Sequence, residues 1–346
     1  MKAVAHGLEG IVVAETRLSD VDGEKGELII AGTRVDELAG RKRFEEVCAT
    51  LWDQPSVSLG PARVAAFEAL PRLGAALDLQ DGMDALRAAI GQLPSTTDAL
   101  GVSGAMGVFA AAWSRRQRGL TPLSPDPSLP HATDVLRMVT GEASPALAAA
   151  LDAYLVTVID HGMNASTFTA RVIASTQSDL VSAVTGAVGA LKGPLHGGAP
   201  GPVLDMLDAV GSPENAEPWL LAELQAGRRV MGMGHRVYKV RDPRAAVLEA
   251  AVERLEREGV TSRRLQLARA VEQVATRVLA KRYPDRSLQA NVEFYTAVLL
   301  DTVGLPRTTF SPLFAVGRVG GWCAHFAEQR ATGRLIRPES RYARAG

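Results

Sequence analysis

The chain has few cysteines and no excess of charge of either sign, and each shortage excludes a class of protein. Cys48 and Cys323 are the only cysteines in 346 residues, so we expect neither a disulfide framework nor a cysteine-based zinc site. Basic and acidic side chains number 38 each, which gives zero formal net charge. A nucleic-acid-binding protein usually carries a basic excess. We therefore expect a protein of a reducing, cytoplasmic compartment without a nucleic-acid partner.

Long hydrophobic runs are also lacking. The first ten residues contain no apolar core of the kind that signal peptides have. The most apolar stretch, about 156–190, is interrupted by Asp160, Arg171 and Asp179, so we expect no membrane span. Hydrophobic residues make up 47 % of the chain and charged residues 22 %, as in ordinary globular proteins. This length allows one large core or two domains.

A β-hairpin is predicted near the N-terminus, and helices thereafter. The β-compatible runs 12–21 and 27–30 flank Asp22–Gly26, which has the composition of a turn. Alternating strand and helix units are absent, so a doubly wound sheet is not expected. The sequence predicts a mostly helical protein.

Three kinds of pattern place the helices. Prolines follow a capping side chain at Ser144, Asp242 and Ser311, where helices are expected to begin. Apolar residues recur at helical spacing over 247–255 and over 267–278. The segment 166–191 is rich in small residues, which favours an inner helix of a packed bundle.

Three of the six histidines lie beside glycine in loops of low helix propensity: His161, His196 and His235. Glycine permits close approach of a ligand, and histidine can donate or accept a proton near neutral pH. The alternative is that each is a structural histidine, although three in similar settings weaken that interpretation. Their spacing lacks the His-x-x-x-His pattern of a helical metal site, so no metal is expected.

Arginines near these loops suggest an anionic ligand. Arg244 follows the Asp242-Pro243 cap, Arg318 lies in an apolar helix, and Arg337 precedes a proline. A buried guanidinium is costly without a partner, and a carboxylate is its natural one. A structural salt bridge is the alternative for each. Together with the histidines, they favour a small di- or tricarboxylate.

Seven segments, in order from about residue 8 to 340, resemble the motifs of the citrate synthase family, which includes 2-methylcitrate synthase. They are GLEGIVVAETRLSDVDGEKGELII near the N-terminus, DHGMNAST at 160–167, LKGPLHGGA at 191–199, MGMGHRVYK followed by DPR within 231–244, NVEFY at 291–295, SPLFAVGR at 311–318 and RLIRP at 334–338.

The resemblance implies an all-α citrate synthase fold with a short N-terminal β-hairpin. The large domain would comprise residues 1–199 and 299–346, and the small domain residues 200–298. The active site would lie between them and close around its substrates, which excludes water. The resemblance also implies a homodimer.

Three residues would then carry the chemistry. A thioester methyl is a weak carbon acid, so its deprotonation needs a base and stabilisation of the enolate oxygen. By resemblance, Glu293 would be the base and His196 would donate a hydrogen bond to the thioester oxygen. His235 would polarise the ketone of oxaloacetate.

The remaining site residues would hold the substrates. Oxaloacetate would contact His161, Asn164, Arg244, Arg318 and, from the neighbouring subunit, Arg337. Coenzyme A would contact Val230, Met231, Gly232, Met233, Gly234 and Lys239. No permanently bound cofactor is implied, since the coenzyme A thioester is a substrate.

Two departures from the family pattern lie at the expected site. Glu293 stands where the family has Asp, and Gly162 stands where it has Glu, directly after His161. The leading interpretation is an acyltransferase that makes citrate from acetyl-CoA and oxaloacetate, as in the tricarboxylic acid cycle. The alternatives are 2-methylcitrate synthase, which uses propionyl-CoA, and a paralogue that binds CoA or a tricarboxylate without useful turnover.

Overall fold

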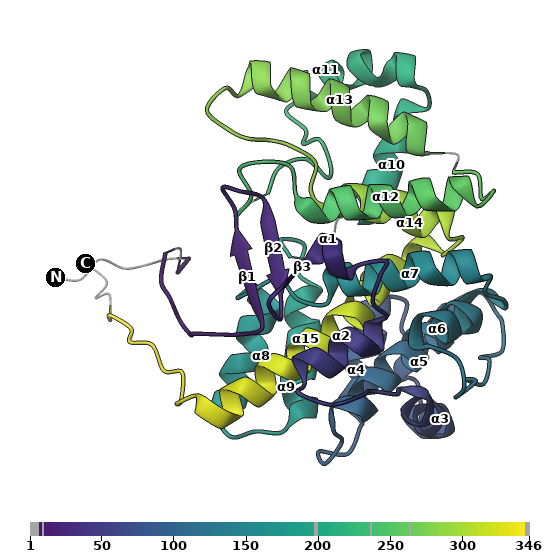
Figure 1. Ribbon diagram of the computed structural model, residues 1–346, viewed down its shortest axis with the longest axis vertical. Helices are drawn as coiled ribbons and strands as arrows, with labels where there is room; N and C mark the ends of the chain where they lie inside the picture. Colours follow the sequence, from purple (N-terminus) through teal and green to yellow (C-terminus); the bar gives the residue numbers. More distant parts are fainter. Residues whose placement is uncertain (1–6, 9, 197–199, 236, 263, 343–346) are drawn as a thin grey trace.

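The computed structural model describes residues 7–8, 10–196, 200–235, 237–262 and 264–342. The predicted all-α architecture is confirmed, because helices make up most of the fold and the strands are short (Figure 1). The helices are α1 Val35–Leu38, α2 Phe44–Leu51, α3 Gly60–Ala69, α4 Gly82–Ile90, α5 Ala99–Gln117, α6 His131–Thr140, α7 Pro145–Val158, α8 Ala165–Ser175, α9 Leu180–Leu191, α10 Pro200–Val210, α11 Ala216–Gln225, α12 Pro243–Arg257, α13 Leu265–Arg282, α14 Val292–Thr302 and α15 Phe310–Thr332. Short 3-10 helices are η1 Leu70–Leu73, η2 Ala76–Asp78, η3 Pro213–Asn215 and η4 Arg307–Thr309.

The predicted hairpin is present and carries a third strand. Strands β1 Ser19–Asp22 and β2 Glu27–Ile30 pair antiparallel, and β3 Thr33–Arg34 adds to β2. The first strand is shorter than the predicted run, which began at residue 12. Its partner explains the difference, because β2 ends at Ile30, which pairs with Ser19. Ala31 still donates its N–H to the carbonyl of Leu18, but its φ of 48° ends the extended strand there.

Two of the three predicted helix starts are confirmed. The side chains of Ser144 and Asp242 cap α7 and α12, each followed by proline at the first helical position. The prediction for Ser311 is wrong, because α15 begins at Phe310 directly after η4. Proline is tolerated within a first turn, since backbone N–H groups there have no intrahelical acceptor. The helix therefore begins before Pro312.

The segment 166–191 forms two helices, and the expectation of a single inner helix is wrong. Helix α8 ends at Ser175, after which Gln177 adopts a left-handed conformation with φ of 71°. Asp179 then caps α9 by accepting a hydrogen bond from the backbone N–H of Ser182. The Asp179 cap starts a new helix within the segment. The two helices, α8 and α9, pack against each other.

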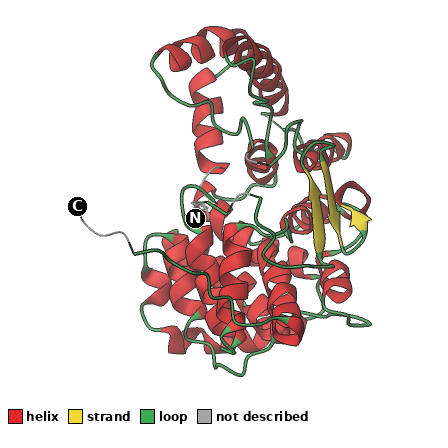
Figure 2. Ribbon diagram, turned by 90° about the vertical axis from the view of Figure 1, so that its left-hand side faces the viewer, coloured by secondary structure: helices red, strands yellow, loops and turns green. Residues whose placement is uncertain are grey.

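Helix α15 runs through the lower bundle of Figure 1 and packs against α5, α7, α8 and α9. A second group, α10 to α14, lies above this bundle, with α12 against both α14 and α7. Figure 2 shows the sheet at one edge of the molecule, beside the place where the two groups meet. Among the described residues, none of the helices is long and apolar enough to cross a membrane.

Candidate active site

The structure brings His161 and His235 together from opposite groups of helices. His161 follows α7, and His235 lies in the segment before α12. Their ring centroids are 5.5 Å apart. The hydroxyl of Tyr238 lies 3.0 Å from Nε2 of His161, and its ring lies 4.8 Å from that of His235. Tyr238 thus links the two predicted histidines.

The hydrogen bonds of His235 decide where its proton lies. Its Nδ1 accepts the backbone N–H groups of Val237 and Tyr238 at 3.0 and 3.2 Å, so a neutral ring carries its proton on Nε2. Burial, helped by the charge of Arg244, lowers the pKa of His235 to about 4. Nε2 lies 3.4 Å from Nη2 of Arg244. Because Nε2–H of His235 and Nη2 of Arg244 are both donors, a ligand oxygen could accept a hydrogen bond from each of them.

Arg244 is held in place by the helix cap itself. Oδ1 of Asp242 accepts the backbone N–H and Nε of Arg244, both at 3.0 Å, and Oδ2 accepts Nη2 at 2.7 Å. Oδ2 also accepts the backbone N–H of Val292 at 3.1 Å. Both charged side chains are buried. One carboxylate therefore orients the arginine and fixes the start of α14 beside it.

Arg318 is a buried cation without a carboxylate bonded to it among the described residues. Its side chain on α15 is 1 % exposed. Nε donates to the carbonyl oxygen of Val158 at 2.6 Å, and the guanidinium lies 4.8 Å from the centre of the Phe314 ring. Burial lowers the pKa of Arg318 to about 10, so the group stays charged at neutral pH. Such a cation suits the carboxylate of a ligand.

His196 is oriented by Ser166 at the start of α8. Nε2 of His196 accepts the backbone N–H of Ser166 at 3.2 Å and lies 2.8 Å from its hydroxyl. Trp322 donates its indole N–H to the same hydroxyl at 3.1 Å. Because Nε2 is an acceptor, the neutral ring carries its proton on Nδ1. Burial lowers the pKa of His196 to about 4. Residues 197–199 of the predicted loop lie outside the described residues.

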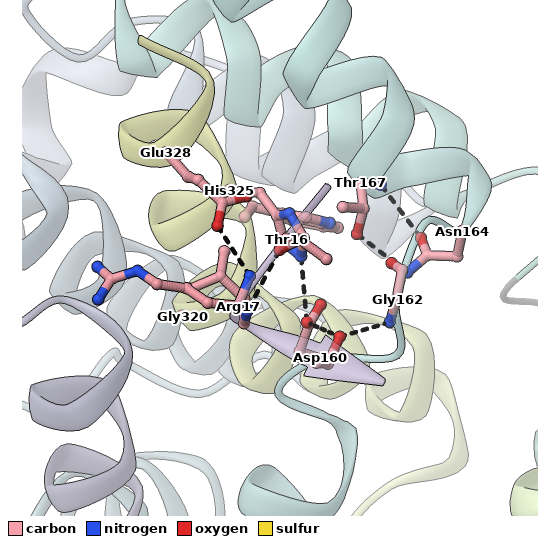
Figure 3. A network of polar contacts seen from close by, with 12 residues as sticks. Thr16, Arg17, Asp160, Gly162, Asn164, Thr167, Gly320, His325 and Glu328 are labelled. Carbon is pink, nitrogen blue, oxygen red and sulfur yellow. Dashed lines mark hydrogen bonds and ion pairs between the residues drawn. The ribbon is translucent and has the colours of Figure 1, made fainter. Parts of the chain in front are cut away.

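Asn164, shown in Figure 3, caps α8, and this cap places Ser166. Its Oδ1 accepts the backbone N–H groups of Ser166 and Thr167, both at 3.1 Å. Its Nδ2 donates to the carbonyl of Gly162 at 3.2 Å and to the hydroxyl of Thr167 at 2.9 Å. Both the oxygen and the nitrogen of the Asn164 amide are therefore hydrogen-bonded within the loop. Ser166, which contacts His196, follows two residues later.

Glu293 lies in the first turn of α14, where Asn291 fixes it. The side chain of Asn291 accepts the backbone N–H of Glu293 at 3.2 Å and donates to the carbonyl of Gly234 at 2.9 Å. The same cap therefore ties Glu293 to the segment that carries His235. Burial raises the pKa of Glu293, and the charge of Arg244 opposes the shift. A carboxyl with a raised pKa is suited to accept a proton near neutral pH.

The segment expected to contact coenzyme A lies between α11 and α12. Val230 is buried, and Met233 bridges Ala290 in the segment before α14. Gly232 has φ of 72°, and an added Cβ would lie 2.9 Å from the Phe294 ring. The side chain of Lys239 is exposed, and its backbone N–H donates to the carbonyl of Gly23 in the hairpin at 2.8 Å. The hairpin thus supports this segment.

Arg337 and Gly162 lie where the sequence pattern alone could not place them. Arg337 is exposed in the extended segment after α15, and no described hydrogen bond joins it to the site residues already described.

Gly162 has φ of 58°, and an added Cβ would lie 3.3 Å from Val21 of β1. Its N–H donates to the hydroxyl of Ser19 at 2.9 Å. A left-handed glycine therefore fits closely against the hairpin directly after His161.

Sequence reasoning missed the roles of several supporting residues. Tyr238 and Ser166 lie inside motifs that were recognised, yet only the fold shows that they contact His161 and His196. Asp242 was predicted as a helix cap, but its second function is to bind Arg244. Trp322 follows Arg318 by one helical turn, and this spacing could have indicated that both face the same side of α15.

Comparison with known proteins gives one consistent result. The family model described as "Citrate synthase, C-terminal domain" matches residues 7–339. "Putative citrate synthase 2" of Mycobacterium tuberculosis is 39 % identical over 355 residues, covering 98 % of this chain and 93 % of that protein. A 2-methylcitrate synthase of the same species is 36 % identical, with 98 % and 90 % covered.

Among solved structures, the Thermoplasma acidophilum citrate synthase matches with a TM-score of 0.89 and 26 % identity, covering all of this chain and 97 % of the other. That structure is a ternary complex with carboxymethyl coenzyme A and oxaloacetate. Matches that span nearly the whole length of both chains leave one conclusion about descent: this chain belongs to the citrate synthase family.

Proposed function

We propose that the protein condenses acetyl-CoA with oxaloacetate and water to give citrate and CoA. One observation supports this above all. Two neutral histidines, His196 and His235, each have one ring nitrogen bonded to the protein and the other protonated, and a carboxyl of raised pKa, Glu293, is tied to the segment of His235. A base and two N–H donors are the groups that enolisation of a thioester and attack on a ketone require.

The steps follow from these groups. Glu293 removes a proton from the methyl carbon of the thioester, while Nδ1–H of His196 stabilises the enolate oxygen. The enolate carbon then forms a bond to the ketone carbon of oxaloacetate. Nε2–H of His235 stabilises the developing alkoxide and supplies its proton. Water finally cleaves the thioester of citryl-CoA, which releases CoA and citrate.

Oxaloacetate would lie against the cations around His235. Arg244 and Arg318 would each take a carboxylate, and His161 and the Asn164 cap would complete the pocket wall. Arg337 would reach the site of a second copy, so we propose a homodimer. Its exposure, in the extended segment after α15, supports an action outside its own subunit.

Coenzyme A would lie along residues 230–234 with Lys239 near its phosphates, as a substrate and not as a resident cofactor. We propose that residues 200–298 form a small domain that closes over the remainder, with boundary residue 199 outside the described part of the chain. The pairing of His161 with Tyr238 supports this, because each half of the contact comes from a different domain. We propose a cytoplasmic protein of the tricarboxylic acid cycle.

Acyl preference is a separate question, because propionyl-CoA differs by one methylene and a 2-methylcitrate synthase is among the relatives. The experiment is release of the CoA thiol with oxaloacetate present, with acetyl-CoA and propionyl-CoA compared by kcat/KM. A higher kcat/KM for acetyl-CoA supports the proposal, and a higher value for propionyl-CoA assigns the alternative. Release with neither donor, while oxaloacetate still binds, would assign a binding protein without turnover.

A further inference from the structure

A buried histidine on α15 lies outside the site yet is bonded to the segment that carries His161. His325 is fully buried, with Nδ1 3.0 Å from Nη1 of Arg171 and Nε2 3.1 Å from Oδ2 of Asp160. An arginine can only donate, so Nδ1 accepts and Nε2–H donates to the carboxylate. The three side chains form a directed chain that ends on the residue before His161, and Figure 3 shows His325 beside Asp160.

The far end of this chain is held firmly. Arg171, 2 % exposed on α8, donates to Oε2 of Glu328 at 2.6 Å and to Oε1 of Gln329 at 3.0 Å. Both acceptors lie on α15, as does His325. The orientation of His325 is therefore fixed by two helices of the lower bundle before it reaches Asp160.

The near end holds His161 from both sides. Oδ2 of Asp160 also accepts the hydroxyl of Ser19 at 2.5 Å, and that hydroxyl accepts the backbone N–H of Gly162 at 2.9 Å. Asp160, the residue before His161, is therefore bonded to both His325 and Ser19. Gly162, the residue after it, is bonded to Ser19. A shift of the Asp160 carboxylate would move the backbone of His161 with it.

A second buried trio shows what a purely structural arrangement looks like in the same protein. Arg63 donates directly to Asp134 at 2.7 Å, while His131 lies 3.5 Å from Nη1 of Arg63 and is not interposed. These residues come from α3 and α6, and none of them adjoins a residue of the proposed site. Of these two trios, the one of Arg171, His325 and Asp160 has its histidine between the cation and a carboxylate that flanks His161.

We propose that His325 is a positioning residue, which fixes Asp160 and through it sets His161 for binding oxaloacetate. This inference rests on the proposed function, since it takes oxaloacetate as the ligand of His161. Residues that orient a ligand-binding group typically change affinity or activity by about 10- to 100-fold when replaced. Because His161 contacts substrate throughout the reaction, the effect should fall on KM and not on kcat.

The test uses the full-length protein and four variants. His325→Phe removes both hydrogen bonds, whereas His325→Gln can still accept from Arg171 and donate to Asp160. Ser19→Ala removes only the partly exposed hydroxyl and keeps the experiment decisive if His325→Phe does not fold. His131→Phe is the matched control, a buried histidine of the other trio. For each, calorimetric binding of oxaloacetate, KM and kcat, and the midpoint of urea unfolding are measured.

The expected result separates position from stability. His325→Phe should raise the Kd and KM for oxaloacetate about 10- to 100-fold, with kcat changed less than about threefold. Ser19→Ala should raise the Kd and KM about threefold or more. His325→Gln should restore most of the affinity that His325→Phe loses. His131→Phe should lower the urea midpoint without changing KM. Unchanged KM and Kd in folded His325→Phe, or in Ser19→Ala, would overturn the inference. Native protein that binds no oxaloacetate would overturn the proposed function, and the inference with it.

Discussion

Shortening the proposed base by one methylene is the sharpest perturbation that the site offers. In Glu293→Asp the carboxyl group recedes by about 1.5 Å, the length of one carbon–carbon bond. The backbone cannot follow, because the side chain of Asn291 caps this turn and Asp242 accepts the N–H of Val292 at 3.1 Å. The carboxylate should therefore retreat from the carbon whose proton it removes.

A displacement of about 1 Å costs on the order of 100-fold in rate, so kcat of Glu293→Asp should fall by about that factor, or about 2.7 kcal/mol in the barrier. Glu293→Gln removes the base altogether, and its kcat should fall by about 10²- to 10⁴-fold. Both changes leave the hydrogen bonds that hold Arg244 and Arg318 in place, so KM for oxaloacetate should stay close to the native value.

The assay is CoA thiol release with each substrate varied in turn while the other is saturating, and thermal unfolding is recorded for each variant. Native-like unfolding with the predicted loss of kcat would support Glu293 as a base adapted to the longer side chain. The reasoning fails if Glu293→Asp is as fast as the native protein or faster. It fails equally if Glu293→Gln keeps more than about a tenth of native kcat, since another group would then remove the proton.

Further predictions concern the surroundings of this base. Tyr238→Phe removes one hydrogen bond to His161, worth about 0.5–1.5 kcal/mol, so KM for oxaloacetate should rise about two- to tenfold; an unchanged KM would show that this bond does not serve binding. Gly232→Ala combines left-handed strain with a contact of 2.9 Å to the ring on α14, whereas Gly259→Ala, at φ of 88° with open space, has strain alone. Gly232→Ala should therefore lower the unfolding free energy by about 1–3 kcal/mol more than the control, and equal losses in denaturant titrations would argue against the close packing. Burial raises the pKa of Glu293 above 4.5, so kcat/KM should fall as pH drops through a pKa above that value, and an acid limb at or below 4.5 would contradict the assignment.

Local patterns were enough to predict several elements of the fold. The turn residues Asp22–Gly26 predicted the hairpin, and the proline-containing caps at Ser144 and Asp242 predicted two helix starts. These succeeded because capping and turn preferences act over three or four residues. The prediction failed at Ser311, where a neighbouring 3-10 helix decides where α15 begins.

Some features of the candidate site could likewise be predicted from the sequence, and others could not. The sequence by itself determined the family, the Gly-flanked histidines and the replacement of Asp by Glu293, because these are properties of residue identity and order. Only the tertiary structure decided that Tyr238 bonds His161, that Arg318 donates to the carbonyl of Val158 and not to a carboxylate of the described residues, and that His325 reaches Asp160. Each of these depends on side chains from separate helices meeting in a low-dielectric interior, and no spacing along the chain encodes such a meeting.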